Sequence, residues 1–151
     1  MTQLDLDFNA SRLNMADLIV CAITIYAEAR SESHTGKLAV AQVIHNRTHA
    51  KGWRNTYGDT CQQPWQFSCW NALIEGQSVD RNHAQMLRLT TPAMFDHLCR
   101  YIDIMLDVVE SPHVILPDDV WHYHTKYVSP SWAAKLDVHS TIGAHIFYTG
   151  R

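Results

Sequence analysis

Two apolar helical patterns, separated by only a few polar residues, constrain the fold of this chain most. Over residues 14–29 the apolar side chains repeat at helical spacing and form one stripe, which predicts an amphipathic helix. Asn14 and Asp17 have the spacing of a capping box at its start. A polar loop over residues 31–35 precedes a second helix, predicted over residues 37–49, whose first half is apolar nearly all round. A short helix of that kind is usually central to its domain.

The later part of the chain predicts one more helix and a little β-structure. Thr91 and Pro92 mark the start of a helix whose apolar positions, from Phe95 onward, fit helical spacing. Residues 120–124 and 145–148 alternate in the manner of strands. We therefore expect an α+β domain that is mainly α, with a small antiparallel β element packed on a helical body.

Two further stretches have less regular patterns. Residues 50–70 contain glycine, proline and interleaved aromatic residues without a helical or strand period, which is typical of a long functional loop. Residues 1–13 read as an N-terminal arm, and residues 14–151 as a single catalytic domain.

Composition excludes several classes of protein. With 46% apolar and 18% charged residues the chain is globular, and a net charge of -3 argues against a nucleic acid partner. No apolar run approaches the ~20 residues that cross a bilayer, so we expect no stable membrane insertion. The N-terminus lacks the pattern of a secretory signal, which predicts a protein that is cytoplasmic at synthesis. We expect a monomer.

The four cysteines do not form the framework of a disulfide-rich protein. Cys21 and Cys99 lie within helical apolar patterns and are predicted to be reduced packing residues. Cys61 and Cys69 are closer together in sequence, but their spacing matches no common zinc motif.

Glu28 is the acidic residue whose position suggests chemistry. It falls on the flank of the first apolar stripe, at the end of its helix, so it would be half-buried. Burial of that degree raises the pKa of a glutamate from about 4.3 toward about 6, where it donates a proton at neutral pH. On this fragment alone, the pattern favours a solvated surface charge. The polar residues Asn46 and Arg47, at the end of the second helix, are expected to be paired structurally.

Several stretches, in order and spacing, resemble the spore-cortex-lytic (SleB-like) cell wall hydrolase family. They span most of the chain, from about residue 15 to residue 148. The matching stretches are residues 25–32, Gly36 with 39–47, 66–68, His122 with Tyr123, 128–132, Ile142 with Gly143, and 145–148.

This resemblance implies a lysozyme-like or lytic-transglycosylase-like helical domain. The implied activity is cleavage of the bond between N-acetylmuramic acid and N-acetylglucosamine in the glycan strands of peptidoglycan. The family's catalytic acid carries over to Glu28. The candidates for substrate binding are Gln66, Phe67, Tyr123, His122 and Tyr148, with Trp65 and Trp132 as weaker ones. Each tryptophan is otherwise expected to pack in the core.

Glycoside hydrolysis normally uses two carboxyl groups. The candidates to pair with Glu28 are Glu32, Asp59 and Glu75, but Glu32 is expected to be a solvated helix-end charge. One clear acid suits a lytic transglycosylase, in which the sugar's own 6-hydroxyl closes an anhydro ring.

We expect no required cofactor, although the sequence leaves calcium and zinc open. A phage endolysin, released to the wall at lysis, fits the missing signal.

Three alternatives remain open from the sequence. A zinc-dependent peptidoglycan amidase would use His122 and His124 with His139 or His145, because residues i and i+2 of a strand share a face. A non-catalytic cell-wall-binding module would use the aromatic residues alone. A Cys-His nucleophile pair built on Cys69 has no local motif behind it.

Overall fold

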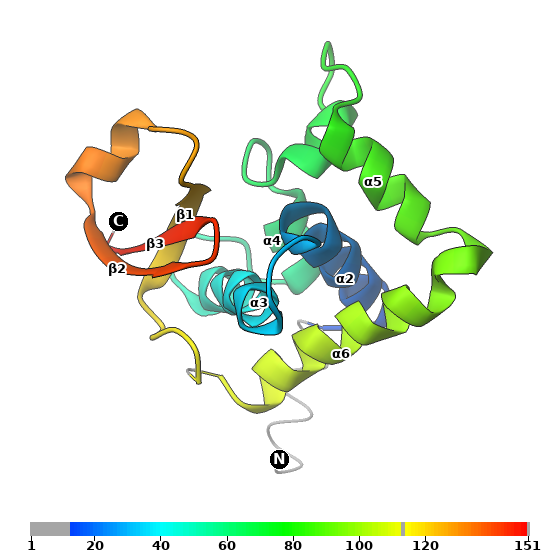
Figure 1. Cartoon of the computed structure of the whole chain (residues 1–151), viewed down its shortest axis with the longest axis horizontal. Helices are drawn as coiled ribbons and strands as arrows, with labels where there is room; N and C mark the ends of the chain where they lie inside the picture. Colours follow the sequence, from blue (N-terminus) through cyan, green and yellow to red (C-terminus); the bar gives the residue numbers. More distant parts are fainter. Residues whose placement is uncertain (1–12, 113, 151) are drawn as a thin grey trace.

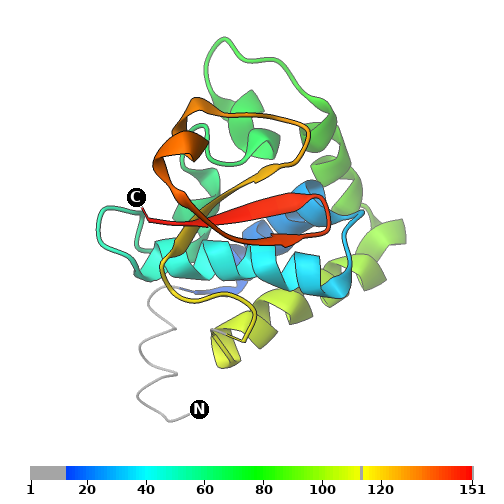
Figure 2. The ribbon, with the colours of Figure 1, turned by 60° about the vertical axis from the view of Figure 1, so that its left-hand side comes forward.

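Helix α3 (His34–His49) lies at the centre of the molecule, with helices on one side and a small sheet on the other (Figures 1 and 2). This computed structural model describes residues 13–112 and 114–150. Ala41 and Ile44 belong to the apolar cluster of the helices, whereas Ala39 and Val43 belong to the cluster under the sheet. Burial on both sides explains why the first half of α3 is apolar all round, as predicted for a central helix.

Helix α3 begins three residues earlier than its apolar pattern predicts. The Ser33 side chain accepts a hydrogen bond from the Gly36 backbone N–H at 3.2 Å and caps the helix at its N-terminus. The polar loop that the sequence predicts over residues 31–35 is therefore shorter in the structure.

Helix α2 (Met15–Ala29) starts at the predicted capping box. The Asn14 side chain accepts from the Asp17 N–H at 2.8 Å, and the Asp17 side chain accepts from the Asn14 N–H at 3.0 Å. The second carboxylate oxygen of Asp17 accepts from the Gly58 N–H at 3.0 Å, which fixes helix α4 (Tyr57–Gln62) against α2. The predicted N-terminal arm, apart from residue 13, lies outside the described residues.

The stretch predicted to be a long loop contains regular structure. Helix α4 and the 3₁₀ helix η1 (Ser68–Leu73) lie within or at the end of residues 50–70. Helix α5 (Arg81–Leu89), which the sequence reading missed, follows an Asp80 cap. Its buried residues, His83, Met86 and Leu89, are few, because only one narrow stripe of α5 contacts the core.

The long predicted helix is confirmed. A 3₁₀ turn, η2 (Pro92–Met94), leads into α6 (Phe95–Glu110), which packs against α2 and α3. Phe95 is an exception to the predicted apolar stripe, since its side chain is exposed. Among the described residues, no helix has both the length and the apolar character needed to cross a bilayer.

The sheet contains β1 (Val120–Thr125), β2 (Asp137–Ile142) and β3 (His145–Thr149) in the antiparallel order β1-β3-β2. The 3₁₀ helix η3 (Ser131–Lys135) connects β1 to β2. Strands β1 and β3 match the predicted segments, and β2 was missed because its residues are mostly polar and exposed. The predicted mainly α, α+β fold with a small antiparallel element is confirmed.

Glu32 corrects a prediction, because it is not a solvated charge. Its side chain is 11% exposed and lies 3.7 Å from His145 Nδ1. Its Oε1 accepts a hydrogen bond from the Ala144 N–H at 2.8 Å. Gly143 has a positive φ of 57°, and a Cβ there would come within 2.5 Å of Glu32 Oε1. Glu32 therefore ties the connection between α2 and α3 to the β2–β3 turn.

The four cysteines are free thiols, in agreement with the predicted absence of a disulfide framework. Cys21 is buried in the core as predicted, whereas Cys99 is only partly buried. Cys61 lies beside Cys21, with their sulfur atoms 3.8 Å apart.

Candidate active site

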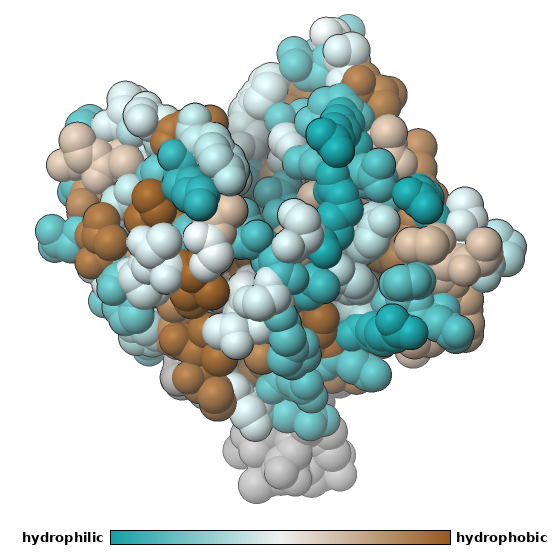
Figure 3. All heavy atoms as spheres, viewed as in Figure 1, coloured by the Kyte–Doolittle hydropathy of each residue, from teal (hydrophilic) through white to brown (hydrophobic). Residues whose placement is uncertain are grey.

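Glu28 lies where the helical part of the molecule meets the sheet. It occupies the last turn of α2, and its Oε2 accepts a hydrogen bond from the Tyr123 hydroxyl of β1 at 3.2 Å. The backbone of Ser68, at the start of η1, lies close to the same carboxyl group. The space-filling view shows a notch between the lobe that carries the sheet and the lobe that carries α5 (Figure 3).

The surroundings of Glu28 favour its protonated form. Burial raises the pKa of Glu28 to about 7, and the negative charge of Asp80 acts in the same direction. The Tyr123 hydrogen bond, the Ser68 backbone and the Arg47 charge lower this pKa, but burial outweighs them. A carboxyl group in this state carries its proton near neutral pH, as the sequence reading expected for a half-buried acid.

The two oxygens of Glu28 have different environments. Burial raises the pKa of the Tyr123 phenol well above its ordinary value, so Tyr123 remains a donor toward Oε2. Oε1 is shielded from solvent and has no hydrogen-bond partner in the described part of the chain, although the Ser68 backbone lies close enough to the carboxyl group to lower its pKa. The proton of the acid form therefore belongs on Oε1, which has no partner among the described residues to accept it.

Arg47 places a buried positive charge beside this carboxyl group. Its Nε donates to the Trp121 carbonyl at 2.7 Å, and its guanidinium lies 4.5 Å from the Trp53 ring centre and 5.3 Å from that of Phe67. The Arg47 side chain is 4% exposed, yet its NH1 has no hydrogen-bond partner within the described residues. The predicted structural pairing is thus correct for Asn46, which bonds Gln42, Pro117 and Val120, but incomplete for Arg47.

Aromatic rings extend from Arg47 across one face of the sheet. The His122 ring centre lies 5.7 Å from that of Trp53 and 5.4 Å from that of Trp132. The Trp132 ring centre lies 5.6 Å from that of His124 and 5.5 Å from that of Tyr148. Burial, with a smaller contribution from the Arg47 charge, lowers the pKa of His122 to about 4, so this imidazole is neutral at physiological pH. We name these five rings the aromatic row.

The predicted substrate-binding residues occupy different places. Tyr123 and His122 lie at the site, and Tyr148 belongs to the aromatic row, although it is 6% exposed. Phe67 is 1% exposed and packs beneath Arg47, so a direct sugar contact would require this ring to move. Gln66 is partly buried.

The tryptophans also differ from one another. Trp70 is a core residue that donates to Thr24, as predicted for a packed indole. Trp65 is 61% exposed, contrary to that prediction. Trp53, which sequence reasoning did not single out, joins the aromatic row because Arg47 holds its ring.

None of the acids nominated to pair with Glu28 is placed to do so. The Glu32 carboxylate accepts from the Ala144 N–H and lies beside His145, while Asp59 and Glu75 are exposed. Asp80, which sequence reasoning missed, acts on Glu28 through its charge, but its carboxylate accepts from the His83 N–H at 2.7 Å as the cap of α5. A cap motif was the only signal for Asp80 in the sequence.

The histidines offer little support for the zinc alternative. His122 and His124 share a face, as predicted, since both contact Trp132. His124 uses one ring nitrogen toward the Thr125 carbonyl and the other toward the Tyr148 hydroxyl, both at 2.7 Å. Over residues 13–112 and 114–150, no three His, Cys, Asp or Glu side chains are grouped as a metal site requires.

A family model described as Cell Wall Hydrolase matches residues 31–148. The chain belongs to the cell wall hydrolase family. The predicted resemblance is thereby confirmed, and this cell wall hydrolase is an enzyme that degrades peptidoglycan. The matched residues begin three positions after Glu28, so the role of this acid is argued from the geometry of the site.

Two solved structures share the fold of this cell wall hydrolase. The catalytic domain of the Bacillus cereus SleB protein is 21% identical, with a TM-score of 0.62 over 90% of this chain and 91% of that chain. The catalytic domain of the germination-specific lytic transglycosylase SleB from Bacillus anthracis is 22% identical, with a TM-score of 0.63 over 91% and 97% of the two chains. The comparison with curated proteins gave no match.

Proposed function

We propose that this enzyme cleaves the glycosidic bond between N-acetylmuramic acid and N-acetylglucosamine as a lytic transglycosylase, with Glu28 as general acid and then general base. Glu28 Oε1 donates its proton to the departing glycosidic oxygen. The resulting carboxylate takes the proton of the sugar's 6-hydroxyl, whose oxygen bonds to the anomeric carbon and closes the anhydro ring. Atoms balance without water, and the reaction requires no metal ion.

The observation that carries this proposal is the buried carboxyl group of Glu28, whose pKa is raised to about 7 and whose Oε1 has no partner among the described residues. An acid of that kind suits proton transfer at neutral pH, which contributes roughly 10² to 10⁴ in rate. Among the acids of the described residues, Asp80 is the one whose negative charge raises the pKa of Glu28, and one of its carboxylate oxygens is taken by the cap of α5. This favours ring closure by the substrate over hydrolysis.

The neighbouring side chains suit a glycan. The aromatic row presents ring faces on which the C–H faces of sugars pack, and neutral His122 adds hydrogen-bonding nitrogens without a charge. The unpartnered NH1 of Arg47 would donate to a hydroxyl or acetamide oxygen of the sugar bound at Glu28. The name of the Bacillus anthracis structure, a lytic transglycosylase, is consistent with this chemistry.

Mass spectrometry of digested peptidoglycan tests the reaction directly. We expect muropeptides that carry a 1,6-anhydro sugar and therefore lack the mass of one water relative to the hydrolytic product. Fragments that have gained water would identify a muramidase and would overturn the lyase. Free peptides released at the lactyl amide would instead identify the amidase, and binding without cleavage would identify a wall-binding module.

The pH dependence of lysis provides a second test. Activity should fall as the pH rises through about 7, because Glu28 then loses the proton it donates. The Tyr123 hydrogen bond lowers the pKa of Glu28, so in Tyr123→Phe this falling limb should move to higher pH. Initial rates of turbidity loss with purified walls, at constant ionic strength, measure both profiles. Tyr127→Phe is the matched control, since Tyr127 is exposed. A limb that stays in place in Tyr123→Phe would contradict the role given to this hydroxyl.

A further inference from the structure

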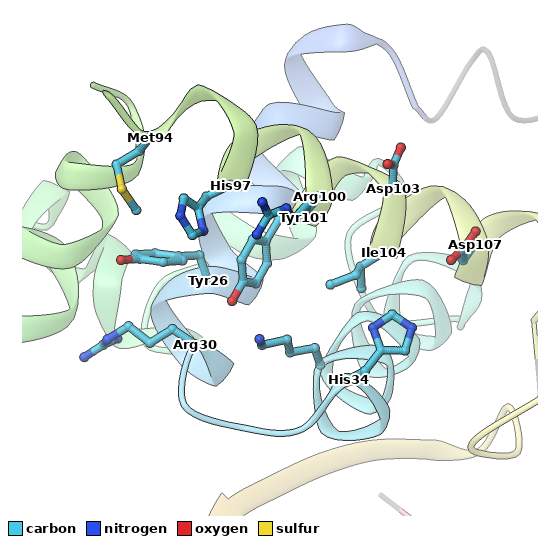
Figure 4. A pocket seen from close by; sticks show the side chains of 11 residues that line it. Tyr26, Arg30, His34, Met94, His97, Arg100, Tyr101, Asp103, Ile104 and Asp107 are labelled. Atoms are coloured by element: carbon cyan, nitrogen blue, oxygen red, sulfur yellow. The ribbon is translucent and has the colours of Figure 1, made fainter. Parts of the chain in front are cut away.

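A second hollow lies at the corner where α2, α3 and α6 meet, and its volume is about 670 Å³. A volume of this size lies within the range of small-ligand sites. Figure 4 shows Arg30, Tyr26 and His97 at one end of this pocket and His34 with Asp107 at the other. We name it the corner pocket; its lining residues are Tyr26, Arg30, His34, Lys37, Met94, His97, Arg100, Tyr101, Asp103, Ile104 and Asp107.

The corner pocket gathers cations that lack acidic partners. Arg30, Lys37 and Arg100 come from three different helical segments. The single ion pair within the described residues joins His145 and Glu32, so none of these three cations is paired with a carboxylate there. This gathering is unexpected in a chain whose net charge is -3. Asp103 and Asp107 also line the pocket, so its three cations exceed its two carboxylates by one charge. A concave site with an excess of positive charge favours an anionic ligand.

The walls of the corner pocket add donors and apolar surface. Tyr26 and Tyr101 pack edge to face with ring centres 5.4 Å apart, and the Lys37 ammonium lies 5.3 Å from the Tyr101 ring centre. Burial raises the pKa of Tyr101 to about 12, so its hydroxyl keeps its proton and remains available as a donor. This set of donors, spread over an apolar base, matches a ligand with several carboxylates and a carbon skeleton better than a compact inorganic anion.

A short chain of contacts connects the corner pocket to Glu28. Arg30 NH1 lies 3.4 Å from the Asn82 side-chain oxygen, and the Asn82 amide donates to the Ser68 hydroxyl at 2.9 Å. The Ser68 backbone lies close to Glu28. Because Glu28 and Arg30 belong to the same end of α2, one branched polymer could occupy the site and the pocket together.

We propose that the corner pocket binds the acidic stem peptide of peptidoglycan while the glycan that carries this peptide lies at Glu28. The proposal rests on the proposed function for its choice of ligand. The carboxylates of the peptide pair with Lys37, Arg30 and Arg100, and its aliphatic parts lie on Tyr26, Tyr101 and Met94. Stem-peptide binding would restrict the enzyme to glycan that still bears its peptides.

Direct titration tests the pocket without any cleavage. A synthetic stem peptide free of sugar is added to the parent, to Arg100→Ala and to Lys37→Ala/Arg100→Ala, and binding is followed by calorimetry at low salt. We expect the double variant to bind about tenfold more weakly, with Arg100→Ala between it and the parent. Arg88→Ala, which removes an exposed arginine of α5 outside the pocket, should bind like the parent. Thermal unfolding checks that each variant is folded.

Phosphate competition and cleavage assays distinguish a stem-peptide site from a simple anion site. Inorganic phosphate at the peptide's concentration should not displace it, and equal displacement would identify a simple anion site and overturn the proposal. Failure of the parent to bind the peptide, or equal binding by all variants, would also overturn it. In parallel, the double variant should lose its preference for intact peptidoglycan over peptide-stripped glycan. If neither polymer is cleaved but the peptide binds, the proposed function fails and the peptide site stands.

Discussion

Wall lysis by the Glu28→Gln variant should fall to background. The amide has the shape of the acid and keeps an oxygen for the Tyr123 hydroxyl, but it has no proton to donate at neutral pH. We expect a loss of at least 10² to 10⁴ in rate, the usual contribution of general acid–base catalysis. Turbidity loss of purified walls and the yield of anhydro-muropeptides measure it. Clearing at the parent's rate would remove Glu28 from the mechanism.

The same substitution should stabilise the fold above neutral pH. The pKa of Glu28 is about 7 in the folded protein against 4.5 for its ordinary value, so the folded state retains a proton that the unfolded state has lost. The parent therefore loses stability as the pH rises from 4.5 to about 7, and the loss is constant above that. Glutamine has no such titration, so its advantage should grow over this window to about 3 kcal/mol.

Chemical denaturation at several pH values measures this difference in the free energy of unfolding. Glu75→Gln, at an exposed glutamate, is the matched control and should show no comparable growth. A Glu28→Gln advantage that does not change between pH 4.5 and 7 would mean that the carboxyl group is hydrated and ionised. An inactive variant that also unfolds more easily would mean that the loss of lysis is a loss of fold.

Replacing Arg47 should give the second largest effect. We expect Arg47→Met to lose roughly 10² in rate, the usual effect of removing one donor that faces reacting groups. Arg47 also lowers the pKa of Glu28 through its charge, so the falling limb of the pH profile should move to higher pH in this variant. Arg47→Lys keeps the positive charge but lacks the planar guanidinium. We therefore expect its falling limb to lie at nearly the parent's pH, while its rate of lysis stays below that of the parent.

The pH limb separates a functional role of Arg47 from a structural one. Arg47→Met leaves the Trp121 carbonyl without its donor, which costs about 1 to 3 kcal/mol of stability. A purely structural effect would lower the rate through unfolding and would leave the limb where it is. Full activity with an unchanged limb would show that neither the charge nor the free NH1 serves the site.

The sequence predicted elements whose signals are local. The capping box at Asn14 and the apolar stripe of α6 depend on neighbouring residues, and both are present in the structure. Strand β2 and helix α5 were missed, because each has few buried residues and is stabilised mainly by the elements beside it. The predicted start of α3 was three residues too late. The Ser33 cap starts the helix at His34, although His34 and Thr35 do not continue the apolar pattern.

The candidate site was predictable only in part, for the same reason. The position of Glu28 on its helix indicated partial burial, and the family resemblance pointed to Tyr123. No local pattern shows that Glu32 reaches a backbone N–H 112 residues away, so it was misjudged as solvated. Likewise Arg47 was correctly predicted to be bonded, but an unpartnered NH1 becomes visible only when β1 and the Trp53 ring are in place.

Strand β3 lies between β1 and β2 although it follows both of them in the sequence. Within the described sheet, β3 is the strand that pairs with β1, so residues 145–149 help to hold the Tyr123 phenol over the acid. A nascent or truncated chain would thus contain the helix that carries Glu28 without the surroundings that tune it. Residues 145–149 therefore complete, more than a hundred positions further along the sequence, the surroundings of the acid that helix α2 carries.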